Sequence, residues 1–282
     1  MRAFSRLAVL IPLVLALGGI RAAAAGSPRT SPRGAPAAPA ALPLVGQRAL
    51  YRLVLSKPRP GGVVAGSGTM GFEVVDACGG WAVRQRLDMT LVDADGQVTH
   101  TRSDYATWEA KDGLRFRFHS LDLTNGEVTD RLAGSARLER TGGPGTVTYS
   151  EPGTKTMKLP PGTLFPMAQT EAIIEAGRAG KKFMASPLFD GTDDSGASYS
   201  SVAIAGWSKP GPSHYAALSG LPSTRVSVAF FSRKRDAMLP DFEIGMRYYV
   251  NGVADQLVMN FGGFTMLGRM MHLAVLPSHC PG

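Results

Sequence analysis

The chain has 282 residues, 44% of them hydrophobic and 18% charged, with a formal net charge of +8. Arg2, Arg6 and Arg21 supply three of these charges and lie in a segment expected to be removed, so the remainder carries +5. Lys and Arg are otherwise scattered among acids, apart from Arg233-Lys-Arg235. Nucleic-acid binding requires a concentrated basic patch with stacking aromatics, so the composition argues against nucleic acid as a partner.

The N-terminus has the three parts of a secretory signal peptide. A basic start at residues 1–6 precedes an apolar run at 7–20, and an alanine-rich exit follows at 22–25. An uncleaved membrane anchor is the alternative, but the apolar run is short for a membrane span and contains Pro12. We therefore expect residues 1–25 to be a signal peptide and the mature chain to be exported.

Residues 26–42 are dominated by Pro, Ala and Gly and show no apolar periodicity. Such a composition predicts an extended, disordered linker. The rest of the chain, 43–282, is long enough to form one domain with a sizeable core.

The chain contains only two cysteines, Cys78 and Cys280, one near each end of this domain. Paired thiols are typical of exported proteins, because the compartments outside the cytosol are oxidising. The sequence therefore predicts a Cys78–Cys280 disulfide that fastens the last strand to an early one. Two unrelated free thiols are the alternative.

Most of the domain alternates apolar and polar residues with a period of two, which is typical of half-buried β-strands. Asn125-Gly126 and Asn251-Gly252 are strong signals for tight hairpin turns, and 93–96 is a further turn. The expected strands of the first half are 49–55, 67–75, 81–91, 97–108, 114–119, 128–138 and 146–149. Those of the second half are 182–188, 200–207, 225–233, 242–250, 252–260 and 261–276.

One segment, 167–178, lacks this alternation and is rich in Ala, Glu and Ile, which predicts a helix. Pro166 suits its first turn, while Gly177 and Gly180 suit its end. About a dozen strands and one main helix predict an all-β fold, a large antiparallel sheet that curls into an open barrel.

No catalytic or metal-binding motif stands out. The chain has no Gly-x-Ser-x-Gly, Ser-x-x-Lys, His-Glu-x-x-His or Cys-x-x-Cys pattern. Acidic residues at 93–96 and 190–194 could hold calcium, but acid-glycine pairs between strands are usually plain turns. Glu171 and Glu175, four apart on the helix, are expected to form a solvated face rather than an acid/base pair. We expect neither a metal nor a cofactor.

The late strands are apolar on both faces and rich in methionine, whose flexible side chain lines adaptable apolar grooves. Ordinary core filling is the alternative. If there is a groove, its expected lining residues are Phe242, Met246, Met259, Phe264 and Met266.

Several segments together resemble the cell-envelope integrity protein EipB family. They are Cys78-Gly-Gly-Trp81, the helix entry at 159–166, the turn at 188–191 and the terminal Cys280. The resemblance implies a periplasmic protein with an open antiparallel barrel, described as a β-spiral, and a helix packed against it. It also implies the same disulfide, a role in maintaining the envelope and a link to a periplasmic tetratricopeptide-repeat protein.

Three hypotheses for function follow. The first is a non-enzymatic envelope factor that binds a partner protein or an apolar ligand. The second is a lipid or lipoprotein carrier, because the implied shape is similar to that of periplasmic lipoprotein carriers. The third is a hydrolase whose catalytic residues come together only in the folded chain.

Overall fold

The computed structural model describes residues 44–58, 62–231 and 239–280. The expected signal peptide (1–25) and linker (26–42) lie outside the described residues, as does Arg233-Lys-Arg235. Within the described ranges, no helix has the length and apolar character needed to cross a membrane.

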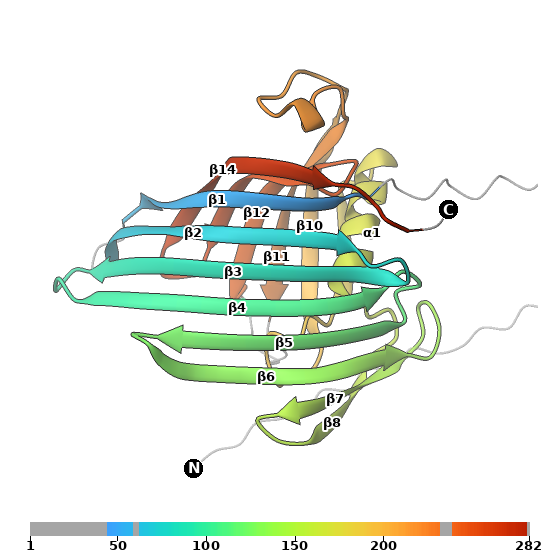
Figure 1. The fold of residues 1–282 in the computed structure, drawn as a ribbon, viewed down its shortest axis with the longest axis horizontal. Coiled ribbons are helices and arrows are strands. Elements are labelled where there is room, and N and C mark those ends of the chain that lie inside the picture. Colours follow the sequence, from blue (N-terminus) through green and yellow to red (C-terminus); the bar gives the residue numbers. More distant parts are fainter. Residues whose placement is uncertain (1–43, 59–61, 232–238, 281–282) are drawn as a thin grey trace, which may run out of the picture. The chain divides into compact units, whose positions relative to one another are not determined.

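Fourteen antiparallel strands form one sheet in the described part of the chain, with one α-helix and one short 3-10 helix (Figure 1). The first eight strands are β1 (Gly46–Lys57), β2 (Val63–Asp76), β3 (Gly80–Asp93), β4 (Val98–Ala110), β5 (Arg115–Thr124), β6 (Glu127–Leu138), β7 (Gly145–Glu151) and β8 (Lys155–Leu159). The later elements are α1 (Pro166–Arg178), β9 (Phe183–Leu188), β10 (Ser198–Ser208), η1 (Ala216–Leu218), β11 (Ser223–Phe231), β12 (Phe242–Tyr249), β13 (Ala254–Asn260) and β14 (Thr265–Leu276).

The first and last strands pair with each other in the interior of the sheet. β1 lies between β2 and β14, so the strand order runs from β8 down to β1 and then from β14 down to β9. The free edges are therefore β8 and β9, which are consecutive in the chain and joined through α1. The first and last strands are therefore not the edges of the sheet, a pairing that residue alternation cannot show because it reports which face is buried and not which strands pair.

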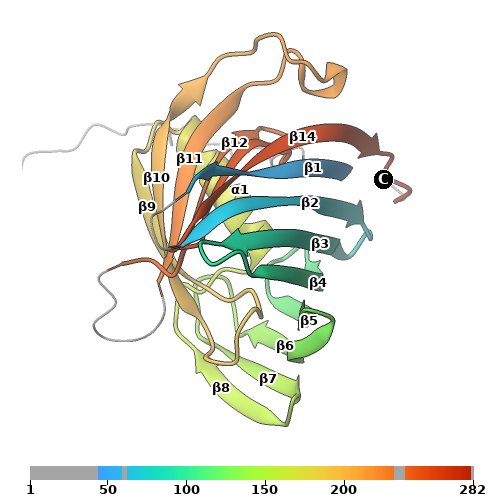
Figure 2. The same ribbon diagram turned by 90° about the vertical axis from the view of Figure 1, so that its left-hand side faces the viewer.

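The sheet curls into a trough and does not close into a barrel (Figure 2). Helix α1 lies inside the trough, where it packs on β9, β10 and β11. The segment between β8 and α1 approaches the other edge at one point, where Leu164 donates its amide to the Pro187 carbonyl. The predicted all-β fold with an open, curled sheet and one main helix is confirmed.

Helix α1 forms where the sequence places its signals. Pro166 occupies the first turn, where its missing amide proton costs nothing, and the chain turns at Gly180 with a positive φ of 73°. Ile173 and Ile174 are fully buried against the sheet. Gly177 allows the close approach of β11, because a Cβ there would lie 2.8 Å from the Thr224 hydroxyl.

Two main apolar clusters fill the trough. The larger joins β1 and β2 to the late strands and α1, with Tyr51, Leu53 and Met266 among its fully buried members. The other joins β5 to β8 and contains five aromatic side chains, with Phe189 packed edge-on against the Phe118 ring at 5.4 Å. Fully buried aromatic rings contribute some of the largest single terms in core stability, so this second cluster firmly anchors the loop after β9.

The predicted strands match the observed ones in place, and most are longer than expected. Two elements were missed. β8 (Lys155–Leu159) is a short edge strand with two exposed lysines, so its alternation is weak, and η1 is only three residues long. Positive φ at Asn125 and Gly126 agrees with the predicted hairpin turn.

The Cys78–Cys280 disulfide is present, with a Cα–Cα distance of 5.2 Å across 202 residues of sequence. It ties the segment after β14 to the β2–β3 turn. Asp76 supports this junction, since its carboxylate accepts a hydrogen bond from the Cys78 amide (3.0 Å) and pairs with the Lys111 ammonium (2.7 Å). The Lys111 ammonium also lies 4.5 Å from the centre of the Trp81 ring.

Candidate functional site

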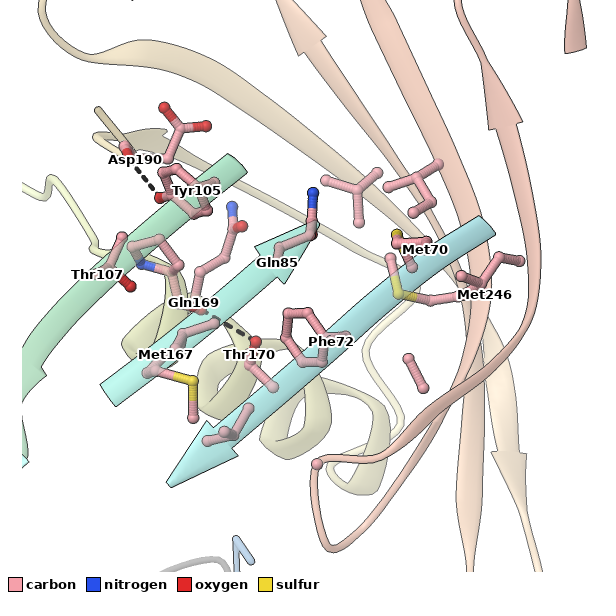
Figure 3. A pocket seen from close by; sticks show the side chains of 18 of the residues that line it. Met70, Phe72, Gln85, Tyr105, Thr107, Met167, Gln169, Thr170, Asp190 and Met246 are labelled. Carbon is pink, nitrogen blue, oxygen red and sulfur yellow. Dashed lines mark hydrogen bonds between the residues drawn. The ribbon is translucent and has the colours of Figure 1, made fainter. Parts of the chain in front are cut away.

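A cavity of about 380 Å³ lies on the concave face of the sheet, between α1 and the strands opposite it. Its wall takes residues from β1 to β5 on one side and from β11 to β13 on the other (Figure 3). Ligand sites typically measure roughly 300–1,000 Å³, so this cavity suits one small ligand.

Much of the wall is apolar. Strands β2 and β11 to β13 contribute methionine and phenylalanine side chains, and Val74, Val83 and Ile173 extend this surface toward α1. The Met and Phe residues on this part of the wall are Met70, Phe72, Phe230, Phe242, Met246 and Met259.

The structure separates the five residues expected to line a groove. Phe242, Met246 and Met259 are on the cavity wall. Met266, by contrast, is fully buried in the core, and Phe264 stacks on the Phe261 ring at 4.9 Å and does not reach the wall. Both of these come from the β13–β14 region, where the sheet packs closely on itself, which periodicity alone could not show.

The rest of the wall is polar, and this polar band lies on the concave side of β3, β4 and β5. Strand register places Phe72 opposite Gln85, and Gln85 opposite Tyr105. The row continues to Ser120 on β5. A neighbouring row brings Ser103 opposite Asp122. The concave surface thus changes from apolar to polar from β2 to β5. The strand residues of the polar band are Gln85, Ser103, Tyr105, Thr107, Ser120 and Asp122.

The loop after β9 completes the polar end of the cavity. The Tyr105 hydroxyl donates to the backbone carbonyl of Asp190 (2.5 Å), which fixes the loop against β4 (Figure 3). The Asp190 carboxylate accepts hydrogen bonds from the amide and hydroxyl of Thr192. Burial is the main cause that raises the pKa of Asp190, and it also raises the pKa of Tyr105 well above the usual value.

Helix α1 presents Gln169 and Thr170 to the same cavity. Gln169 is buried and donates through Nε2 to the Ser200 hydroxyl (2.7 Å), while the Thr170 hydroxyl bonds back to the Pro166 carbonyl (3.0 Å). The Gln169 hydrogen bond joins α1 to β10, whereas the Thr170 hydrogen bond lies within the helix itself.

Glu109, at the end of β4, fixes the start of α1. Its two carboxylate oxygens accept hydrogen bonds from the amides of Met167 (2.7 Å) and Ala168 (2.8 Å). The side chain is almost fully buried, and this burial outweighs the two amide hydrogen bonds and raises the pKa of Glu109 to about 7. Glu109 thus satisfies helix amides that would otherwise lack partners.

One acceptor on the wall has no partner in the described structure. Gln47, on β1, is only 3% exposed and donates through Nε2 to the Gly252 carbonyl (3.2 Å). Its Oε1 atom is buried and accepts no hydrogen bond among the described residues. A buried acceptor without a donor costs free energy, so this position favours a ligand or water that donates a hydrogen bond.

Among the residues that the structure describes, the cavity wall carries carboxylates but no cation. Asp122 and Asp190 are both part of it, and no Lys, Arg or His is among the described residues that form it. The five histidines therefore play no part in the described cavity. Hydroxyl groups lie along the polar band, yet none of them is hydrogen-bonded to a histidine or carboxylate from another strand as an activated nucleophile requires.

The acidic segments considered as metal sites behave as turns. Asp190 and Asp193 accept hydrogen bonds from their own loop, at Thr192 and Ser195. No group of three or more potential metal ligands occurs in the described ranges. Glu175 is exposed and Glu171 half-buried, and neither is on the cavity wall. Burial and the neighbouring Glu175 raise the pKa of Glu171.

The polar band was missed at the level of sequence. Its signal was present, because Ser103, Tyr105 and Thr107 alternate along an expected strand and share one face. The sequence does not show that this face points into the trough, and alternating polar residues are otherwise typical of a solvent-exposed face.

Comparisons with known proteins agree with this architecture. A family model described as EipB-like matches residues 38–277. The chain is 32% identical over 251 residues to the Brucella abortus (strain 2308) protein named cell envelope integrity protein EipB. The aligned region covers 86% of this chain and 88% of that protein. A crystal structure of a β-barrel-like protein of a domain of unknown function from Brucella abortus superimposes with a TM-score of 0.75 at 27% identity, covering 84% of this chain and all of the other. The chain belongs to the EipB-like family.

Proposed function

We propose that this protein is a non-enzymatic, periplasmic factor that helps to maintain the cell envelope, and that it acts by binding an apolar ligand in the cavity of its curled sheet. The observation that supports ligand binding is the cavity itself, with its methionine and phenylalanine wall opposite α1. Flexible methionine side chains suit a ligand with a variable apolar chain. The envelope role is supported by the name of the Brucella abortus relative.

The chemistry of the wall supports binding rather than catalysis. The serines and threonines of the polar band have neither a histidine nor a hydrogen-bonded carboxylate beside them among the described residues. The Asp190 carboxylate is held by its own loop, through Thr192. These groups can orient a ligand, whereas nothing in the described wall activates a hydroxyl as a nucleophile.

A lipid-carrier role is the second candidate, favoured by the same apolar wall. The cavity volume is at the lower end of the range for ligand sites, so it favours one acyl chain at a time. A lipoprotein with several chains would need the trough to open further.

Native mass spectrometry of the exported protein, purified without detergent, tests whether the protein retains an apolar ligand. We expect a lipid-sized mass that organic extraction removes, after which an apolar fluorescent probe binds saturably. Met259→Asp places a charge on the cavity wall and should abolish both signals. Val258→Asp is the matched control, because Val258 neighbours Met259 but is 42% exposed on the opposite face.

Envelope function is tested in a strain that lacks the protein. We expect that strain to be sensitive to detergent, that Val258→Asp restores resistance and that Met259→Asp does not. If the wild-type protein retains no adduct and binds no apolar probe, ligand binding is overturned. If Met259→Asp restores resistance fully, the cavity is not needed in the envelope.

A further inference from the structure

We propose that the ligand is a single-chain amphiphile whose head group is uncharged and donates hydrogen bonds, such as a hydroxyl-bearing ester or glycoside. This inference rests on the proposed function, because it names the class of ligand that the same cavity selects. Three features support this proposal: the division of the wall into an apolar and a polar part, its excess of acceptors, and the absence of cations among the wall residues that the structure describes.

The division of the wall matches the two parts of an amphiphile. The Met and Phe side chains of β2 and β11 to β13 surround one part of the cavity, and the polar band of β3 to β5 surrounds the other. Figure 3 shows Met70 and Met246 together, and Tyr105, Thr107 and Asp190 on the other side of the cavity. A purely apolar ligand would leave the polar band desolvated without new partners, which costs free energy.

The wall offers acceptors that a donating ligand could satisfy, at Gln47 on β1 and in the polar band on β4 and β5. Gln47 Oε1 is a buried acceptor without a partner in the described structure. The Asp122 carboxylate and the Thr107 hydroxyl reach the same cavity and make no side-chain hydrogen bond within the described residues. Hydroxyl groups on a ligand would donate to such atoms, whereas a carboxylate or phosphate could not donate to them.

The charge of the wall disfavours an anionic head. Asp122 and Asp190 are both on the wall, and none of its described residues supplies a counter-charge. The N-terminus of α1, which often attracts anions, is already occupied by the Glu109 carboxylate. An anionic head would therefore meet like charges in a partly desolvated site, where repulsion is stronger than in water.

A cationic head is less favoured than an uncharged one. The Asp190 carboxylate already accepts two hydrogen bonds from Thr192. Among the described wall residues, this leaves the Asp122 carboxylate to pair with an ammonium group. Removing an ammonium group from water costs more than removing hydroxyls, which the polar band can pair individually.

Competition among three amphiphiles with the same chain tests the proposal. Monolaurin, laurate and dodecylamine are titrated at neutral pH, below micelle formation, against an apolar fluorescent probe bound to the full exported protein after extraction. We expect monolaurin to displace the probe at a concentration about tenfold lower than laurate or dodecylamine, a factor that requires only one or two neutral hydrogen bonds.

Two variants assign the selectivity to named residues. Gln47→Leu removes the unpartnered acceptor and should weaken monolaurin roughly fivefold, the worth of one hydrogen bond, without changing probe affinity. Asp122→Asn removes one wall charge and should narrow the gap between laurate and monolaurin. Asp130→Asn is its control, because Asp130 pairs with Asp122 across β5 and β6 but is exposed and not on the cavity wall.

The outcomes separate the two proposals. If no amphiphile displaces the probe and none is retained from the envelope, the proposed function fails. If laurate or dodecylamine binds as well as monolaurin, or Asp122→Asn changes nothing, the inference about the head group is overturned while ligand binding stands.

Discussion

Glu109 joins β4 to the start of α1 through two amide hydrogen bonds, and its burial makes that junction sensitive to pH. Because its pKa in the folded protein is raised to about 7 from an ordinary value of 4.5, the folded state binds this proton more tightly than the unfolded chain does. The stability linked to this proton is therefore fully present below pH 4.5 and is lost as pH rises through about 7.

We expect the contribution of Glu109 to the free energy of unfolding to fall by roughly 3 kcal/mol across that window, since each pH unit corresponds to about 1.4 kcal/mol. Tm of the wild-type protein and of Glu109→Gln, measured across the window, checks this. The variant should be less stable at acidic pH, where it has lost an acceptor, and its profile should be flatter. A wild-type profile parallel to that of Glu109→Gln would contradict the shift.

Gly191, in the loop after β9, shows how closely this loop packs on the aromatic cluster. Its φ is +73°, and a Cβ there would lie 2.4 Å from the Phe118 ring. Gly96, in the β3–β4 turn, has a similar φ of +81° with nothing within 4 Å of the added atom. Alanine at either position costs about 1 kcal/mol of backbone strain, but only Gly191→Ala adds overpacking of roughly 1–3 kcal/mol.

Chemical denaturation of Gly191→Ala and Gly96→Ala separates these two terms. We expect Gly191→Ala to lose at least twice as much free energy of unfolding as Gly96→Ala. Equal losses would mean that the loop moves away from Phe118 without cost.

At the scale of elements, the disulfide lies just beyond a strand that is held along its length on one side and only in part on the other. β14 pairs with β1 from Thr265 to Leu276 but with β13 only from Thr265 to Gly268, so residues 269–276 rely on the β1 ladder. The bond closes a loop spanning 202 residues, for which chain entropy gives about 5 kcal/mol as an upper figure. Because the β1–β14 ladder itself orders β14, the disulfide contributes to the free energy of unfolding by restricting the unfolded chain. The residues that it tethers directly are those after Leu276.

We therefore expect Cys78→Ser and Cys280→Ser to lower Tm equally, with the double variant no worse than either single one. Protease cleavage should increase first after Leu276, not within β14. Limited proteolysis with mass spectrometry, on the same variants, locates the cut. Early cleavage inside β14 would show that the disulfide, and not the ladder, holds that strand.

Much of this fold could be predicted from local pattern, and the cavity only in part. Alternation in residues 81–91 and 114–119 placed the strands and their buried faces, because burial on one face requires that period. Pairing of β1 with β14 depends on contacts more than two hundred residues apart, which no local pattern encodes. Met259 reaches the cavity and Met266 does not, although they face each other across β13 and β14. That difference depends on the curvature of the sheet.

At the scale of the whole molecule, the two edge strands of the sheet, β8 and β9, come from the middle of the chain and not from its ends. β8 pairs only with β7, and β9 pairs with β10 and touches Leu164 at one bridge. The β1–β14 seam, formed by the two ends of the domain, lies inside the strand order, with β2 paired to β1 on one side and β13 paired to the Thr265–Gly268 part of β14 on the other. Amides at an edge open more readily than those held between two neighbouring strands.

Hydrogen exchange followed by mass spectrometry should therefore show the reverse of the usual fraying of chain ends. We expect peptides covering 46–57 and 265–268 to exchange more slowly than peptides covering 155–159 and 183–188, because edge strands are paired on one side only. Cys78→Ser should preserve this ranking, since the seam is held by its ladder. Seam peptides that exchange as fast as β8 would place the termini at the edges of the sheet and would overturn the topology on which the cavity depends.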